Sequence, residues 1–121
     1  MKRSLMQIYV KESAEAVETY CRAFDASIGA DFRNPDGSCC HVELNAYGQI
    51  LAISEAPADL SVGNGMQFCF HFEANEADKV DRAYEILKEN ARIICPIGEC
   101  SYSSRMFSLI DRFGVYWCLF S

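Results

Sequence analysis

The sequence lacks any apolar run near the roughly 20 residues that a membrane-spanning helix needs. It is also short of positive charge, with 11 Lys and Arg against 17 Asp and Glu and a net charge of −6 at pH 7. A binder of the nucleic-acid backbone needs a basic surface, so we expect no contact with nucleic acid. The first residues turn polar too early for a signal peptide. These absences predict a soluble, cytoplasmic protein that binds no membrane.

The cysteines show a further absence, because no two of them are spaced as Cys-x-x-Cys. Zinc ribbons and thioredoxin-like sites use that spacing, so neither is indicated. An odd number of cysteines without a signal peptide also argues against a secreted disulfide scaffold. We therefore expect reduced thiols that pack mostly as small core side chains. The seven are Cys21, Cys39, Cys40, Cys69, Cys95, Cys100 and Cys118.

Half of the 121 residues are hydrophobic, which is enough for a folded domain, and their periodicity predicts its elements. The first half begins with a strand at residues 7–10, followed by a helix that Ser13 caps and that ends near Asp25. Ala14, Val17, Cys21 and Phe24 lie along the predicted buried stripe of this helix. Three strands follow at residues 27–32, 39–44 and 49–54, separated by turns rich in Gly, Asn and Pro.

The second half repeats this order. Alternating phenylalanines predict a strand at residues 66–73, and Asn75 is expected to cap a helix over residues 76–90. A short strand at residues 93–95 should be closed by Pro96, with a polar loop at residues 98–104. Two final strands are expected at residues 106–110 and 116–120.

The last hairpins of the two halves also match in sequence, with residues 41–51 overlaying residues 107–117 at an offset of 66. Leu44 overlays Ile110, and the turn residue Gly48 overlays Gly114. This repeat indicates an internal duplication. We expect a single domain, residues 1–121, built from a module at about 5–56 and a second at about 66–121, with a linker at about 57–65.

Three segments carry a resemblance to a known family: residues 16–24, residues 41–49 and residues 111–117. The last resembles the family's Asp-Pro-Phe-Gly-His-x-Trp. The chain resembles the vicinal oxygen chelate superfamily (glyoxalase I, bleomycin-resistance proteins, extradiol dioxygenases), and within it the small PhnB-like, glyoxalase-like proteins. The resemblance implies an α+β fold of two tandem βαβββ modules that form an incomplete barrel around a cleft, with helices outside. It also implies a homodimer.

Strand alternation assigns one face of each predicted sheet to the helices and the other to the cleft. The cleft face is polar with a few aromatics, as small-molecule sites are. Arg105 is expected at one end of the cleft, where a guanidinium can receive an anionic group. The predicted ligand-binding residues are Gln7, Tyr9, His41, Glu43, Gln67, Cys69, His71, Arg105, Tyr116 and Cys118.

The resemblance implies that the superfamily's four metal-ligand positions fall on Gln7, Gln67, Ala52 and Cys118. None is His or carboxylate, and the alanine side chain has no donor atom, so we expect that this metal site is lost and that no cofactor is bound. An alternative is a displaced divalent site for Zn, Ni, Mn or Fe, made from His41, Glu43, His71 and Cys118.

The expected function is binding of a small-molecule ligand of unknown identity, in the manner of a bleomycin-resistance-like protein that sequesters its ligand. The alternative is a lyase or isomerase of the same fold that uses the displaced metal or a thiol. For the thiol route, Cys118 paired with a histidine is the candidate nucleophile. A third hypothesis is a structural dimeric module without ligand.

Overall fold

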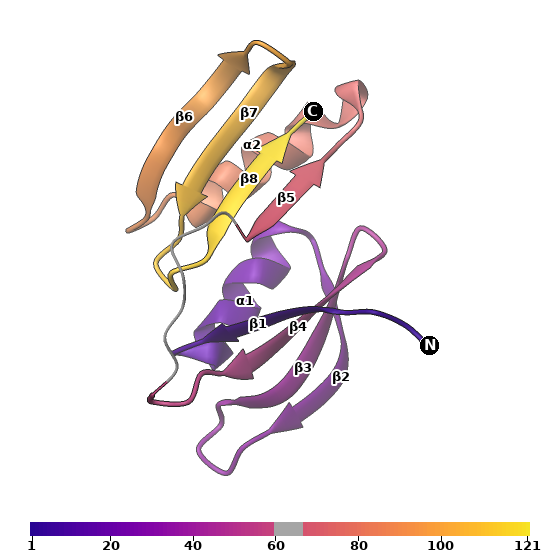
Figure 1. The fold of residues 1–121 in the computed structure, drawn as a ribbon, viewed down its shortest axis with the longest axis vertical. Coiled ribbons are helices and arrows are strands. Elements are labelled where there is room, and N and C mark those ends of the chain that lie inside the picture. The colour runs from indigo at the N-terminus through magenta and orange to yellow at the C-terminus, as the bar shows by residue number, and fades with distance from the viewer. Residues whose placement is uncertain (60–66) are drawn as a thin grey trace. The chain divides into compact units, whose positions relative to one another are not determined.

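The computed structural model describes residues 1–59 and 67–121, and the chain divides near residue 61 into two compact units. Each unit has the order strand, helix and three strands, so the predicted α+β repeat is confirmed (Figure 1). Most of the predicted linker lies outside the described residues. The module boundaries and the single-domain organisation stay predictions.

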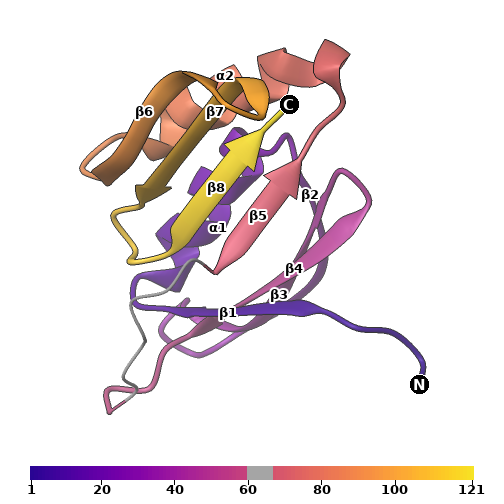
Figure 2. The ribbon, with the colours of Figure 1, turned by 45° about the horizontal axis from the view of Figure 1, so that its top comes forward.

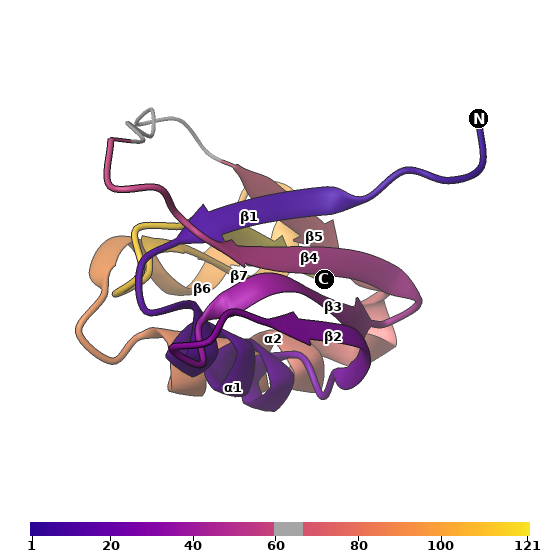
Figure 3. The same cartoon turned by 90° about the horizontal axis from the view of Figure 1, so that it is seen from below.

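The first unit is a four-stranded mixed sheet with one helix. Its strand order is β1-β4-β3-β2, with β1 parallel to β4 and the other pairs antiparallel. Figure 3 shows α1 lying along one face of this sheet. The elements are β1 (Met6–Val10), α1 (Ser13–Ala23), β2 (Ser27–Arg33), β3 (Cys39–Ala46) and β4 (Gln49–Glu55).

The second unit has the same topology. Its strand order is β5-β8-β7-β6, again with the first strand parallel to the last, and Figure 2 shows α2 behind the sheet. The elements are β5 (Phe68–His71), the 3-10 helix η1 (Ala74–Glu76), α2 (Ala77–Leu87), β6 (Arg92–Cys100), β7 (Ser103–Ile110) and β8 (Tyr116–Phe120). No helix in the described part of the chain is long and apolar enough to cross a membrane.

Each unit has an apolar core, formed where the alternation of the strands predicts it. In the first unit Tyr20 and Phe24 of the α1 region are fully buried beside Leu44 of β3, whereas the expected stripe residue Cys21 is only half-buried. In the second unit Trp117 is fully buried, with the ring of Phe68 5.0 Å away. Burial of such large side chains is the main stabilising contribution to each unit.

Both predicted helix caps are wrong. Glu12, with φ of 58°, occupies the N-cap position of α1, and Ser13 is the first helical residue. The Ser13 hydroxyl instead donates to Glu55 Oε1 at 2.8 Å and accepts the Cys39 backbone N–H at 2.8 Å. These bonds tie the helix start to β4 and β3. Before the second helix, η1 intervenes and Glu73 caps it in a reciprocal capping box.

The predicted short strand at 93–95 and polar loop at 98–104 are also wrong, because β6 continues through Pro96 to Cys100. The strand lies at the edge of its sheet, and its pairing with β7 shifts register between Cys95 and Gly98. An edge strand with such irregular pairing tolerates the missing N–H of a proline. Proline therefore marks an irregularity here and not a strand end.

The two last hairpins differ in loop length, so their residue-by-residue overlay is not kept. Tyr47 and Gly48, with φ of 54° and 82°, form a tight loop that makes Leu44 the partner of Leu51. In the second unit the loop runs over residues 111–115, and Ile110 pairs with Tyr116. The order of the elements is the same in the two units, but the pairing of the last hairpin in the second unit is shifted by one residue relative to the first.

We predict that Ser13→Ala lowers the free energy of unfolding by about 1–3 kcal/mol. The Ser13 side chain is fully buried, and its loss leaves the Glu55 carboxylate and the Cys39 N–H each without one partner. Urea denaturation followed by circular dichroism measures this change. The exposed Ser104 supplies the control, since Ser104→Ala should change the free energy by less than about 0.5 kcal/mol. Equal effects of the two substitutions would contradict the assignment.

Candidate functional site

The face of the first sheet opposite α1 carries a lateral row of polar positions. The strand register places Gln7 of β1 beside Ala52 of β4, and Ala52 beside Glu43 of β3. Gln7 Nε2 donates to Ser54 Oγ at 3.1 Å and to the Ala52 carbonyl at 3.3 Å. The glutamine side chain is thus held against β4 by neighbours within its own sheet.

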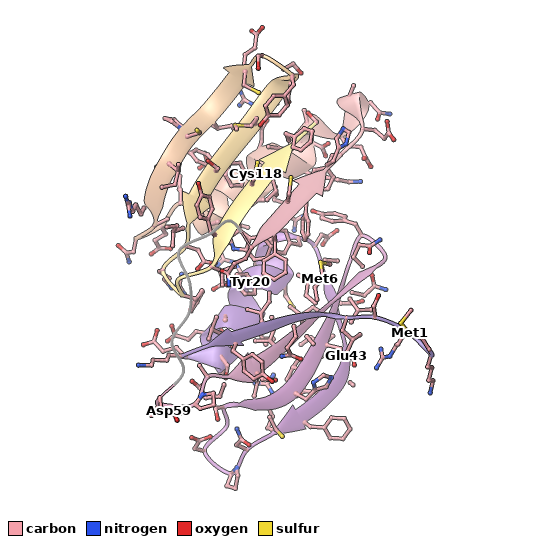
Figure 4. All side chains as sticks on the ribbon, viewed as in Figure 1. Met1, Met6, Tyr20, Glu43, Asp59 and Cys118 are labelled. Carbon is pink, nitrogen blue, oxygen red and sulfur yellow. The ribbon has the colours of Figure 1, made fainter. Side chains whose placement is uncertain are left out.

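Glu43 is the centre of a charged group on this face, marked in Figure 4. Its carboxylate accepts two hydrogen bonds from the Arg3 guanidinium, at 2.7 and 2.9 Å, and lies 2.9 Å from His41 Nε2. The Arg3 hydrogen bond, followed by that of His41, lowers the pKa of Glu43 to about 2. We call Arg3, His41 and Glu43 the Glu43 cluster.

The prediction that His41 and Glu43 share a face is confirmed by their direct contact. Arg3 was missed, because it precedes the first strand and no periodicity marks it. The only signal in the sequence is its charge near the start of a strand whose face carries a carboxylate partner. Bidentate pairing of arginine with carboxylate is geometrically specific, so Arg3 fixes the orientation of Glu43.

The corresponding face of the second sheet carries sulfur. Register places Cys69 of β5 beside Cys118 of β8, Cys118 beside Ser108 of β7, and Ser108 beside Cys95 of β6. Cys118, marked in Figure 4, is buried and Cys69 is exposed. Burial, followed by the neighbouring Cys69 thiol, raises the pKa of Cys118 to about 11. A thiol in this state stays protonated at neutral pH.

Among the remaining predicted residues of the second sheet, His71 and Tyr116 lie on the same face as Cys118, and Arg105 lies on the helix face. The His71 ring stacks on Phe120 at 4.4 Å between centroids, and Gln67 Oε1 accepts the backbone N–H of Tyr116 at 3.1 Å. Arg105 forms an ion pair with Asp81 of α2 at 2.6 Å, so the structure brings it to the helix and not to the cysteine row. In the first unit, Tyr9 is half-exposed on β1.

The register corrects one expected equivalence between the two halves. Gln7 pairs with Ala52, and the residue paired with Cys118 in the second unit is Cys69. The register counterpart of Gln7 in the second unit is therefore Cys69 and not Gln67. The paired residues are separated by four more positions in the second unit than in the first, so no constant offset relates the two pairs.

Comparison with known proteins assigns the family. The sequence pattern of the Glyoxalase/Bleomycin resistance protein/Dioxygenase superfamily matches residues 4–119. The chain belongs to this superfamily. A search of curated proteins finds no significant match.

Several solved structures resemble the chain over nearly its whole length. A PhnB protein from Bacillus cereus has 20% identity, with 98% of both chains covered and a TM-score of 0.82. Protein PA1353 from Pseudomonas aeruginosa has 16% identity, with 99% of this chain and 97% of that chain covered and a TM-score of 0.77. The fosfomycin resistance protein FosX from Listeria monocytogenes has 15% identity, 98% and 91% coverage and a TM-score of 0.70. At these identities the likeness establishes the fold.

The residues at the superfamily's metal-ligand positions do not fit a divalent centre of its usual kind. The resemblance implies Gln7, Gln67, Ala52 and Cys118 at these positions, and the strand register gives Cys69 in place of Gln67. The set contains neither histidine nor carboxylate, and alanine offers no donor atom. Within residues 1–59 and 67–121, no three His, Cys, Asp or Glu side chains gather closely enough to hold an ion. The displaced set of His41, Glu43, His71 and Cys118 joins residues of both units and stays a prediction.

We predict that the stabilising effect of Glu43 disappears in acid. Its pKa is lowered on folding from 4.5 to about 2, so the ionised carboxylate stabilises the fold above pH 4.5. This contribution is lost as the pH falls towards 2, because the Glu43 carboxylate is then protonated in the folded chain as well as in the unfolded chain. Glu43→Gln should therefore be less stable than wild type near neutrality, and the difference should shrink across that range.

Denaturant unfolding at a series of pH values measures this difference. Glu89→Gln, at an exposed position after α2, is the matched control and should leave the pH profile of wild type unchanged. If the difference between wild type and Glu43→Gln stays constant from pH 7 to pH 2, Arg3 and His41 do not stabilise the ionised Glu43 carboxylate.

Proposed function

We propose that the protein binds a small organic molecule through the polar face of its first sheet, without the superfamily's divalent metal. The residues at the paired ligand positions carry this proposal: Gln7 and Ala52 supply no anionic or imidazole donor, while hydrogen-bonding groups lie beside them. Neutral amide, hydroxyl and charged groups arranged on one face are suited to orienting a polar ligand.

Superfamily membership supports a binding role. Its description includes bleomycin resistance proteins, and FosX of Listeria monocytogenes is named as a fosfomycin resistance protein. A resistance protein that sequesters its ligand requires a complementary face but no reaction centre. This role suits a chain in which none of the implied metal-ligand positions holds a histidine or a carboxylate.

The Glu43 cluster supplies preorganised charge for such a ligand. Glu43 is largely buried and held by Arg3 and His41, so its oxygen atoms are fixed before a ligand arrives. Arg3 is half-exposed and keeps donor capacity beyond its two bonds to Glu43. A fixed carboxylate beside an accessible guanidinium favours a ligand that carries both donor and acceptor groups.

The thiol-dependent enzyme is less well supported than binding. A nucleophilic cysteine needs a lowered pKa, and the pKa of Cys118 is raised to about 11. The Glu43 cluster weighs against the purely structural module, because an ion pair with a half-exposed guanidinium adds little net stability. A cytoplasmic homodimer remains part of the proposal, with light scattering of the purified protein as the test of its dimeric state.

We predict that fragment binding maps to the polar face of the first sheet. In an NMR screen of the full chain with a library of small polar fragments, hits should shift the backbone amides of Gln7, His41 and Glu43. Arg3→Ala should weaken these hits by about 10-fold, the effect of losing about 1.4 kcal/mol from a charge-assisted contact.

Lys88→Ala is the control for this screen. Lys88 lies in the second unit, at the end of α2, and its ion pair is with Glu85. It should leave fragment affinities unchanged. Hits that map elsewhere, or a stoichiometric divalent ion retained by the purified protein and required for the hits, would contradict the proposal.

A further inference from the structure

The side-by-side cysteines of the second sheet form a dithiol that the proposed function does not use. Cys69 and Cys118 are register partners on the adjacent parallel strands β5 and β8. Partners on adjacent strands project from the same face, about 4.8 Å apart at the backbone. The neighbouring Cys69 thiol is one of the causes that raise the pKa of Cys118, as expected for two thiols side by side.

The spacing of the strands favours an ion bound between the two sulfur atoms over a disulfide bond. A disulfide draws its two Cβ atoms to about 3.5–4.5 Å, closer than parallel side chains on neighbouring strands stand. An ion bound by two thiolates adds two metal–sulfur bonds of about 2.3 Å each, as in zinc sites. Two such bonds in line match the separation that adjacent strands provide without movement of the backbone.

The number of available donors selects the kind of ion. In the described part of the second unit, no third His, Cys, Asp or Glu side chain joins the pair closely enough to complete a metal site. Zinc requires about four ligands in structural sites, so two thiolates do not suit it. Thiolates select soft cations, and monovalent copper is the biological ion that accepts two sulfur ligands in a linear arrangement.

The surroundings suit a small soft cation. Cys69 is exposed and Cys118 is buried, so an ion can reach the first sulfur from solvent and be held by the second away from water. Tyr102 packs edge-on against Phe120 at 5.3 Å, and His71 stacks on the same ring. Phe120 is two residues from Cys118 on β8, so these ring contacts lie on the same face of the sheet as the cysteine pair.

We propose that Cys69 and Cys118 bind one cuprous ion between their sulfur atoms. Each thiol releases one proton and forms one copper–sulfur bond. One Cu⁺ and two thiols thus give a bis-thiolate complex of charge −1 and two protons, with no change in oxidation state. The site lies within the second unit and is independent of the Glu43 cluster.

Titration of the reduced full-length protein tests this assignment, with Cu⁺ presented anaerobically by a chromophoric chelator. Wild type should remove one equivalent from the chelator. Cys69→Ser should weaken this binding by about 100-fold or more, since a second ligand on the same scaffold adds at least that factor. Cys118→Ala should do the same while keeping a small apolar side chain at the buried position.

Cys40→Ser is the matched control, because Cys40 is an exposed thiol on β3 of the first unit. It should retain wild-type affinity. If Cys118→Ala fails to fold by circular dichroism, the exposed position of Cys69 still gives a decisive variant.

Three outcomes would overturn the copper assignment: wild type removing no copper from the chelator, affinity retained in Cys69→Ser, or equal losses in Cys40→Ser. Arg3→Ala separates this site from the proposed function. It should leave copper affinity unchanged, so failure of fragment binding and failure of copper binding are distinguishable.

Discussion

The parallel pairing of the first strand with the last is the constraint on which each unit depends. Parallel neighbours cannot be joined by a tight turn, so the chain between β1 and β4 must cross over through α1 and two further strands. That crossover places the helix on one face and leaves the opposite face to polar side chains. The same pairing of β5 with β8 brings Cys69 beside Cys118. Both candidate sites are therefore consequences of one topological feature, repeated in each half of the chain.

Sequence periodicity was sufficient for the element order, because alternation in strands and the 3.6-residue period of helices are local signals. It was sufficient for the apolar faces too, including the full burial of Leu44 and Trp117. It failed where a non-local partner decides the outcome. Serine is a common helix-capping residue, but Ser13 instead forms hydrogen bonds with Glu55 and Cys39, which are distant in sequence. Pro96 predicts a strand end from sequence, because the position of β6 at a sheet edge is not visible there.

The candidate sites show the same division between local and non-local information. His41 and Glu43 were predicted to share a face because they are two residues apart on one strand. Arg3 lies 40 residues from Glu43, and its contact depends on how the chain reaches β1. The cysteine pair required the register of β5 against β8, which differs by four residues from that of the first unit. A constant repeat offset cannot supply such a register, because insertions between the paired strands alter it.

The two units use equivalent rows for different chemistry. The row of the first sheet runs Gln7, Ala52 and Glu43, and offers hard oxygen and nitrogen groups fixed by ion pairs. The row of the second runs Cys69, Cys118 and Ser108, and offers mainly soft sulfur. Hard and soft donors prefer different partners, so the two rows of the repeated unit differ in the chemistry they offer to a ligand. In the proposed function and in the proposed copper site, the two rows take different partners. Each row is then free to take its own ligand, which is consistent with charge at one and sulfur at the other.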